Sequence, residues 1–108
     1  MTKVLQRLAD TIATRKASES GASYVAKSLA RGPEKCAEKF GEEAIEAIIE
    51  AVRNDREKLI SEAADVTFHM LIMLAARDVT LADICAELER REGVSGLTEK
   101  ASRTTPQE

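Results

Sequence analysis

Residues 56–77 read REKLISEAADVTFHMLIMLAAR, and this stretch decides the fold. Leu, Ala, Met, Glu and Lys favour the helix, and neither Gly nor Pro interrupts them. Apolar side chains point to almost every side of such a helix, so most of its surface should be buried. The pattern therefore predicts a long core helix over residues 56–77.

Three polar residues share one stripe of this predicted helix. Glu62, Asp65 and His69 are spaced three and four positions apart. Because burying an unpaired carboxylate is costly, the two acids need a cation, a salt bridge or a wet cleft. For His69 we favour a neutral histidine that is bonded to a nearby acid over a direct metal ligand.

Residues 34–53 also predict a helix, and one of its faces is acidic. Positions advance by about 100° per residue, so the charged residues occupy a sector of roughly 100° that faces away from Phe40. They are Lys39, Glu42, Glu43, Glu46 and Glu50, whereas the apolar stripe holds Phe40, Ala44, Ala47, Ile48 and Ala51. A charged face on one helix is most often simply solvated, so this helix alone indicates no site.

A short turn at Asn54-Asp55 joins the two long helices, which should therefore pack antiparallel. The acidic pair of the first helix would then face that of the second. The resulting cluster holds Glu43, Glu46, Glu62 and Asp65. Oxygen ligands without cysteine favour Mg²⁺, with Mn²⁺ as a possible substitute, over zinc. A metal that keeps some of its waters could bridge a phosphate chain.

The first third of the chain predicts two shorter helices. Apolar residues recur at helical spacing over residues 2–14, and the Ser- and Gly-rich residues 18–23 indicate a loop. A short helix should follow from Tyr24 and stop at Arg31-Gly32-Pro33. Six basic residues cluster between positions 15 and 39: Arg15, Lys16, Lys27, Arg31, Lys35 and Lys39. They could reach substrate phosphates, and we expect about half of them to be ordinary surface charges.

The last third predicts one more helix and an arm. Thr80 and Asp83 are spaced as a capping box for a helix over residues 81–92. We therefore expect one all-α domain over residues 1–93, a helical bundle of about five helices whose two long antiparallel helices form the core. Residues 94–108 show no periodicity and should form a partly ordered arm.

Composition narrows the functional classes. The chain has 108 residues, a net charge of −3 and three aromatic residues, which is typical of a single soluble helical domain. Its basic residues are interspersed with acids, so a nucleic-acid partner is not expected. The longest apolar stretch, residues 66–76, falls short of the roughly 20 residues that cross a bilayer. Without a recognisable secretory signal or a paired-cysteine motif, we expect a cytoplasmic protein.

A Glu-x-x-Glu on one helix and a Glu-x-x-Asp on the next resemble the MazG-like all-α nucleoside triphosphate pyrophosphohydrolases. Within that superfamily the chain is similar to the phosphoribosyl-ATP pyrophosphatase family, over about residues 4–91. The motifs that carry the likeness are Lys39-Phe40-Gly41-Glu42-Glu43-Ala44 with Glu46, Glu62-Ala63-Ala64-Asp65 with His69, Ser23-Tyr24 and Lys27-Ser28-Leu29. Residues 95–103 look like the tail of stand-alone bacterial members. Cys36 departs from the usual aliphatic residue, and we expect no fused cyclohydrolase domain.

The resemblance implies a magnesium-dependent hydrolase. Such an enzyme cleaves the bond between the α- and β-phosphates of phosphoribosyl-ATP, which gives phosphoribosyl-AMP and pyrophosphate in the second step of histidine biosynthesis. Four acids would hold the metal: Glu43, Glu46, Glu62 and Asp65. Glu42 would orient the attacking water or complete the metal shell. The substrate would be bound by Lys16, Ser23, Tyr24, Lys27, Lys35, Lys39 and His69.

Two further expectations concern assembly and rival functions. One small bundle cannot easily surround the apolar helix, so a homodimer is expected, and the resemblance implies the same. One rival is a housekeeping pyrophosphohydrolase of other nucleoside triphosphates on the same scaffold, and another is a non-enzymatic helical interaction module. A di-iron bundle needs Glu-x-x-His pairs, but Val66 stands three residues before His69.

Overall fold

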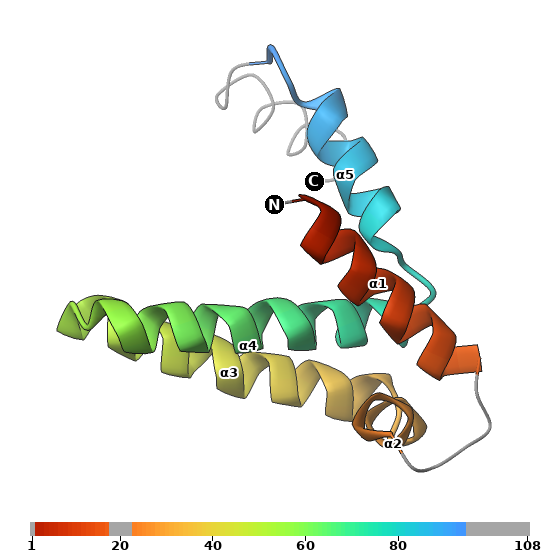
Figure 1. Cartoon of the computed structure of the whole chain (residues 1–108), viewed down its shortest axis with the longest axis horizontal. Coiled ribbons are helices and arrows are strands. Elements are labelled where there is room, and N and C mark those ends of the chain that lie inside the picture. Colours follow the sequence, from red (N-terminus) through yellow and green to blue (C-terminus); the bar gives the residue numbers. More distant parts are fainter. Residues whose placement is uncertain (1, 18–22, 95–108) are drawn as a thin grey trace, which may run out of the picture.

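The structure is a computed structural model that describes residues 2–17 and 23–94. Five α-helices form within these ranges, where no strand occurs (Figure 1). They are α1 (Thr2–Ala17), α2 (Tyr24–Ala30), α3 (Pro33–Arg53), α4 (Arg56–Ala75) and α5 (Leu81–Arg90). The predicted all-α fold with two long helices is confirmed. The predicted loop before Ser23 and the arm after residue 94 lie outside the described residues.

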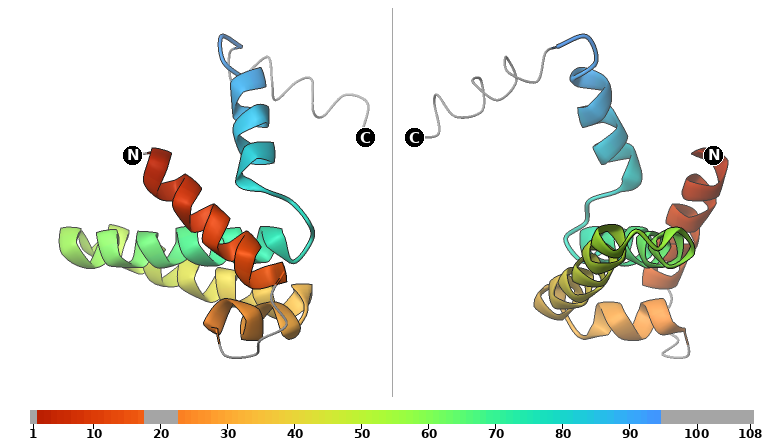
Figure 2. Two further views of the ribbon diagram at one scale, coloured as in Figure 1. Left: turned by 45° about the vertical axis from the view of Figure 1, so that its right-hand side comes forward. Right: turned by 90° about the vertical axis from the view of Figure 1, so that its left-hand side faces the viewer.

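The two long helices form an antiparallel hairpin, with α3 and α4 side by side (Figures 1 and 2). Asn54 ends α3 in a left-handed conformation, at φ 62°, and its N–H donates to the carbonyl of Ala51. Asp55 then caps α4, because its carboxylate accepts a hydrogen bond from the N–H of Lys58 at 3.1 Å. This two-residue connection reverses the chain, as predicted, and fixes which residues of α3 and α4 meet.

The buried core lies at one end of the hairpin, where α1 and α2 cover the second half of α4 (Figure 2). It consists of Ile12, Val25, Cys36, Leu71 and Ile72. The Ile72 side chain is the most enclosed of these, at 1% exposed. The first half of α4 therefore projects beyond the core of its own chain.

Two helix ends differ from the prediction. Helix α1 continues to Ala17, three residues beyond the predicted end, and the amine of Lys16 in its last turn bonds the carbonyl of Ala75 and the carboxylate of Asp78. Basic side chains in a last turn also favour the helix through its dipole. Helix α4 ends at Ala75, two residues early, and Asp78 then takes a left-handed conformation at φ 60°.

Helix α5 projects away from the hairpin in both figures, and none of its residues is buried. Its capping box is confirmed: the Thr80 hydroxyl accepts from the N–H of Asp83 at 3.1 Å, and the Asp83 carboxylate accepts from the N–H of Thr80 at 2.9 Å. The helix ends at Arg90, two residues before the predicted end. No helix in the described part of the chain is long and apolar enough to cross a membrane.

Helix α3 faces α4 differently from what its apolar stripe suggested. Ile48 is 60% exposed, whereas Glu43 of the acidic face is buried. Four exposed apolar residues share one side of α3 instead, and we call this side the outer apolar face: Ile45, Ile48, Ile49 and Val52. The predicted apolar stripe is thus only partly an inward face, because the seam with α4 is shared with acids.

The core at the end of the hairpin generates a stability prediction. Ile72→Ala should lower the free energy of unfolding by about 2–5 kcal/mol, because it removes buried methyl groups and leaves a cavity. Val4→Ala is the control, since Val4 is 58% exposed and should change stability by no more than about 0.5 kcal/mol. Urea unfolding followed by circular dichroism measures both, and equal losses in the two variants would show that α4 is not the core helix.

Candidate functional site

Acidic side chains of α3 and α4 meet in the hairpin. Carboxylate oxygens of Glu43, Glu62 and Asp65 all lie within 4.8 Å of one another. Glu46 follows Glu43 by one turn of α3, and its charge acts on Glu62. The structure therefore brings the two predicted acidic pairs together, and we call these four residues the carboxylate cluster.

The carboxylate cluster carries negative charge that the described residues do not fully balance. Burial raises the pKa of Glu62, and the like charges of Glu46, Asp65 and Glu43 raise it further. The Glu62 oxygen Oε1 is buried and has no hydrogen-bond partner among the described residues. A buried carboxylate oxygen without a partner, beside three like charges, is a strong attractor for a cation.

Lys39 supplies one positive charge at the edge of the cluster. Its amine lies 3.0 Å from Glu43 Oε2 and 3.9 Å from Glu42 Oε1. The hydrogen bond to Glu43 and the charge of Glu43 raise the pKa of Lys39, which stays protonated at neutral pH. One ammonium cannot neutralise four carboxylates, so most of the charge of the cluster remains.

His69 lies under this site as a buried, neutral side chain. It is 7% exposed, and burial lowers its pKa more than the neighbouring Glu43 and Asp65 raise it. The edge of its ring meets Tyr24, with centroids 5.9 Å apart, and Phe68, with centroids 5.2 Å apart. The histidine therefore links the acidic residues to an aromatic contact between α2 and α4.

The donor set of the cluster fits a hard divalent cation. All four side chains offer oxygen and come from two paired helices, and the Glu62 oxygen Oε1 is buried without a hydrogen-bond partner in the described part of the chain. Oxygen ligands of this kind suit Mg²⁺ or Mn²⁺, whereas Zn²⁺ prefers nitrogen and sulfur. The chemistry of the donors thus agrees with the predicted metal, and the role of each residue stays a prediction.

A basic cavity adjoins the cluster between α2 and α3. Its volume is about 490 Å³, and its walls are Tyr24, Arg31, Lys35, Glu38, Lys39 and Glu42. We call it the basic pocket. A narrower cavity shares four of these residues and continues inward to Ser28, Cys36, His69 and Ile72. Because Lys39 and Glu42 belong both to this wall and to the surroundings of Glu43, the pocket opens next to the cluster.

Most of the predicted site residues lie in the carboxylate cluster or line the two cavities beside it. They are Glu42, Glu43, Glu46, Glu62, Asp65, Tyr24, Lys35, Lys39 and His69. Ser23 lies at their edge and caps α2, since its hydroxyl accepts from the N–H of Ala26 at 2.9 Å. Lys27 is exposed on α2 and lines neither cavity.

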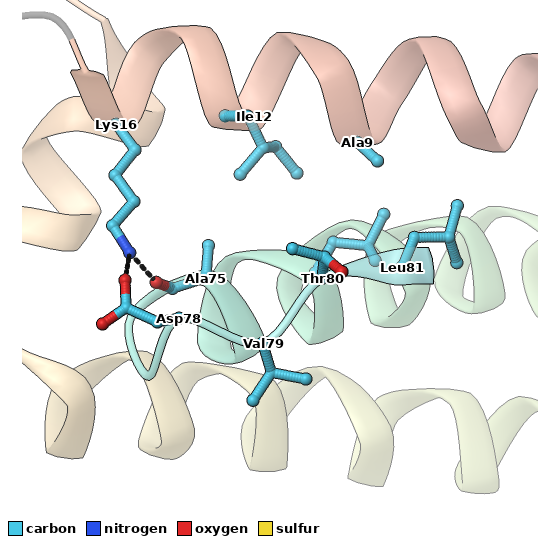
Figure 3. Close-up of a pocket in the computed structure, with 10 residues that line it drawn as sticks. Ala9, Ile12, Lys16, Ala75, Asp78, Val79, Thr80 and Leu81 are labelled. Carbon is cyan, nitrogen blue, oxygen red and sulfur yellow. Dashed lines mark hydrogen bonds and ion pairs between the residues drawn. The ribbon is translucent and has the colours of Figure 1, made fainter. Parts of the chain in front are cut away.

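Lys16 lies apart from the other predicted residues. Figure 3 shows its amine bonded to the carbonyl of Ala75 and the carboxylate of Asp78. Ala75 comes ten residues after Asp65, which is about 15 Å along α4. The cavity beside Lys16, about 180 Å³ in volume, is lined mainly by apolar side chains such as Ile12 and Leu81.

Two residues of interest were not among the predicted site residues. Arg31 lines both cavities between α2 and α3. Its only signal in the sequence was its membership of the basic set in the first third of the chain. Glu50 has a buried oxygen without a hydrogen-bond partner among the described residues, and Arg53 Nε lies 4.0 Å from it. Its signal was its place on the acidic face of α3.

Comparison with known proteins gives a consistent result. A family model described as phosphoribosyl-ATP pyrophosphohydrolase matches residues 5–92. A phosphoribosyl-ATP pyrophosphatase of Cereibacter sphaeroides is 70% identical over 93% of this chain and 97% of that protein. The proteins of that name in Dinoroseobacter shibae and Paracoccus denitrificans are also 70% identical, over 93% and 92% of this chain and 98% and 92% of their own lengths. The matched residues include the whole carboxylate cluster.

The unbalanced charge of the cluster predicts an unusual stability effect. Glu62→Gln should raise the thermal midpoint by a few degrees in the presence of a chelator, because it removes one of the mutually repelling charges. The folded-state pKa of Glu62 is raised, so the wild type loses stability as pH rises through that value. The gain should therefore be larger at pH 8 than at pH 5.

Added magnesium should reverse the order of stability. It should raise the midpoint of the wild type and have much less effect on Glu62→Gln, since a ligand stabilises the state that binds it. Glu57→Gln, an exposed change in the first turn of α4, is the control and should show no gain. Differential scanning fluorimetry measures all three proteins, and a Glu62→Gln variant that is less stable than the wild type in chelator at pH 8 would refute unbalanced repulsion.

Proposed function

The chain belongs to the phosphoribosyl-ATP pyrophosphohydrolase family and is a hydrolase, and we propose that it cleaves phosphoribosyl-ATP into phosphoribosyl-AMP and pyrophosphate with magnesium. The observation that carries this proposal is a carboxylate cluster that lies directly beside a basic pocket. A site for a cation-bound triphosphate needs acidic side chains that bind the cation and basic side chains that bind the phosphate oxygens. Both sets are present, and Lys39 joins them.

The cluster is the proposed metal site, with Glu43, Glu46, Glu62 and Asp65 as ligands. Magnesium bound there supplies positive charge that neutralises the phosphate chain and lowers the pKa of an attacking water. The protein contributes rigidity, because the four side chains stand on two helices that a two-residue turn locks in register. Preorganised charges need little rearrangement during the reaction.

Lys39 holds the phosphate side of the site. Its amine is paired with Glu43 at 3.0 Å and also lines the basic pocket, so it can contact a phosphate oxygen without leaving the cluster. The pairing keeps the amine protonated, which is the form that binds an anion. We expect Lys39 to position the triphosphate against the carboxylates.

Glu42 is the residue that we propose orients the attacking water. Its side chain is 60% exposed on the pocket side of α3 and lies 3.9 Å from the amine of Lys39. Hydrolysis breaks the α–β phosphoanhydride bond; the oxygen of the water joins one product, and a proton must be removed. A carboxylate at the mouth of the site can accept that proton and pass it to solvent.

His69 acts through its neighbours in this proposal. Because burial keeps the imidazole neutral, it can accept or donate a hydrogen bond but adds no positive charge. Its contacts with Tyr24 and Phe68 hold the aromatic wall of the narrower cavity in place. We therefore assign it a positioning role between the acidic residues and the substrate wall.

We place the reaction at the second step of histidine biosynthesis, in the cytoplasm, with phosphoribosyl-ATP as a small-molecule substrate. The names of the relatives support this substrate. A housekeeping pyrophosphohydrolase would share the metal chemistry but would have less need of the basic pocket. An interaction module would have no need of a buried carboxylate oxygen that lacks a partner, as found at Glu62.

We also propose that the protein is a homodimer that closes over the outer apolar face. Ile45, Ile48, Ile49 and Val52 recur at spacings of three, one and three residues and are between 46% and 81% exposed. A stripe of this kind is the pattern of a helix that packs on another helix. Because the same segment of α3 carries Glu46, a partner that covers the face would also stiffen the carboxylate cluster.

Pyrophosphate release from phosphoribosyl-ATP tests the proposed activity. Release should need magnesium and stop with chelator. Glu46→Gln and Asp65→Asn should each reduce it by more than the roughly 10–100-fold that outer-shell changes typically cost. Glu57→Gln is the matched control and should keep its activity. Turnover of ATP or dCTP at the rate of phosphoribosyl-ATP would favour the housekeeping enzyme, and inactivity on all three would favour the interaction module.

The mass in solution tests the proposed dimer. Light scattering should give twice the chain mass of 11.8 kDa. Ile48→Glu should shift the protein to the mass of one chain, because it places a charge in the centre of the outer apolar face. Val4→Glu, at another exposed apolar position, should leave the mass unchanged. A wild type with the mass of one chain, or a variant that stays dimeric, would refute this interface.

A further inference from the structure

The basic pocket extends beyond what a triphosphate at the carboxylate cluster requires. Lys35, Lys39 and Glu43 follow one another at four-residue intervals and so share one side of α3. Lys35 lies eight residues before Glu43, which is about 12 Å along the helix axis. Two groups of charges therefore lie on one side of α3, separated by a distance comparable with the length of a nucleotide.

Arg31 is the cation of this pocket with no ion pair to the described residues. Lys35 lies 3.0 Å from Glu38, and Lys39 is paired with Glu43, but no acid within the described ranges reaches the Arg31 guanidinium. Its backbone is well fixed, since its N–H donates to the carbonyl of Ser28 at 3.1 Å. An arginine at a fixed backbone position whose side chain lines a cavity is well suited to bind a phosphate through two parallel hydrogen bonds.

The turn after Arg31 explains why this side chain faces α3. Gly32 has φ 100°, a conformation that other residues rarely adopt, and it turns the chain between α2 and α3. Pro33 then begins α3. After this turn, Arg31 at the end of α2 and Lys35 in the first turn of α3 line the same cavity.

We propose that Arg31, with Lys35, binds the 5-phosphate of the phosphoribosyl group and thereby selects phosphoribosyl-ATP over simple nucleoside triphosphates. This inference rests on the proposed function. The substrate carries phosphates at both ends: the triphosphate, and the single phosphate of the added ribose. When the triphosphate lies at the carboxylate cluster and Lys39, the second phosphate needs other cations. Arg31 and Lys35 supply them in the basic pocket.

Tyr24 supports this placement from the wall of the basic pocket. It lines both cavities, and its ring is backed by Phe68 at a centroid distance of 6.1 Å and by the edge of His69. The residue remains 53% exposed, so part of its ring is open to a ligand. An aromatic ring on the wall of a pocket that also holds Arg31, Lys35 and Lys39 can stack on the purine that joins the two phosphorylated riboses.

Glu38 occupies Lys35 in the free protein, so the substrate must displace this carboxylate. The amine of Lys35 is bonded to Glu38, and both side chains are more than half exposed. Exposed ion pairs of this kind contribute little to stability, so a phosphate with two negative charges can replace Glu38 at small cost. Arg31 has no such partner among the described residues and should therefore contribute more to the selection.

Kinetics of Arg31→Ala with phosphoribosyl-ATP test the inference. The KM should rise about 10- to 100-fold, the loss expected for a hydrogen bond to a charged group, while kcat changes much less. Arg31→Lys should recover part of the loss. Arg7→Ala, which removes the same charge from an exposed position of α1, should behave as the wild type.

Two competitive inhibitors show which end of the substrate Arg31 binds. Ribose 5-phosphate should inhibit the wild type, and its inhibition constant should rise at least tenfold in Arg31→Ala, whereas that of pyrophosphate should stay unchanged. Equal weakening of both inhibitors, or an unchanged KM in an active enzyme, would overturn the inference alone. A wild type that releases no pyrophosphate from phosphoribosyl-ATP would overturn the proposed function and this inference with it.

Discussion

The repulsion between carboxylates of α3 and α4 is the constraint on which the rest of the structure depends. Oxygens of Glu43, Glu62 and Asp65 lie within 4.8 Å of one another, and only Lys39 among the described residues offsets them with a direct ion pair. Two helices that carry such charges toward each other must be held by contacts elsewhere. The turn at Asn54 and the core around Ile72 provide these contacts at the two ends of the hairpin. These contacts thus hold α3 and α4 together even though the carboxylates in the middle of the hairpin repel one another.

The same constraint decides where the apolar residues go. Because Glu43 and Glu50 occupy the seam with α4, the isoleucines of α3 turn outward, and Ile45 and Ile48 are each 60% exposed. Burial of apolar area is the main favourable term in folding, and a single chain leaves the apolar side chains of this face exposed to water. A partner that covers the outer apolar face would stabilise the helices that carry the acids. Assembly through this face would therefore be coupled to the proposed site through α3.

The parts of the structure that depend on local sequence were predictable. Helical periodicity and the capping box at Thr80 predicted the helices, and the short turn predicted that the acidic pairs would meet. The orientation of α3 was not predictable, because Ile48 and the acids compete for the same seam. Nor was the position of Lys16, which depends on α1 crossing α4 and on a partner 62 residues away. Arg31 belonged to a basic set, but no local pattern shows which of those residues line one cavity.

The order of the charges along α3, relative to the dipole of the helix, suits a ligand that carries both a phosphate and a cation. A helix N-terminus carries partial positive charge, so basic residues there are unfavourable and anions are favoured. Glu34 in the first turn of α3 suits that charge, but Lys35 beside it and Arg31 just before the helix do not, whereas Glu43 and Glu46 follow in the middle. Lys35 and Arg31 thus partly oppose the dipole of the free helix at its start. A bound phosphate at the N-terminal end would relieve the opposition there, and a cation would relieve the repulsion in the middle. A ligand that carries both, such as a metal-bound polyphosphate, complements the helix along its length, which is the physical reason to place the whole substrate on α3.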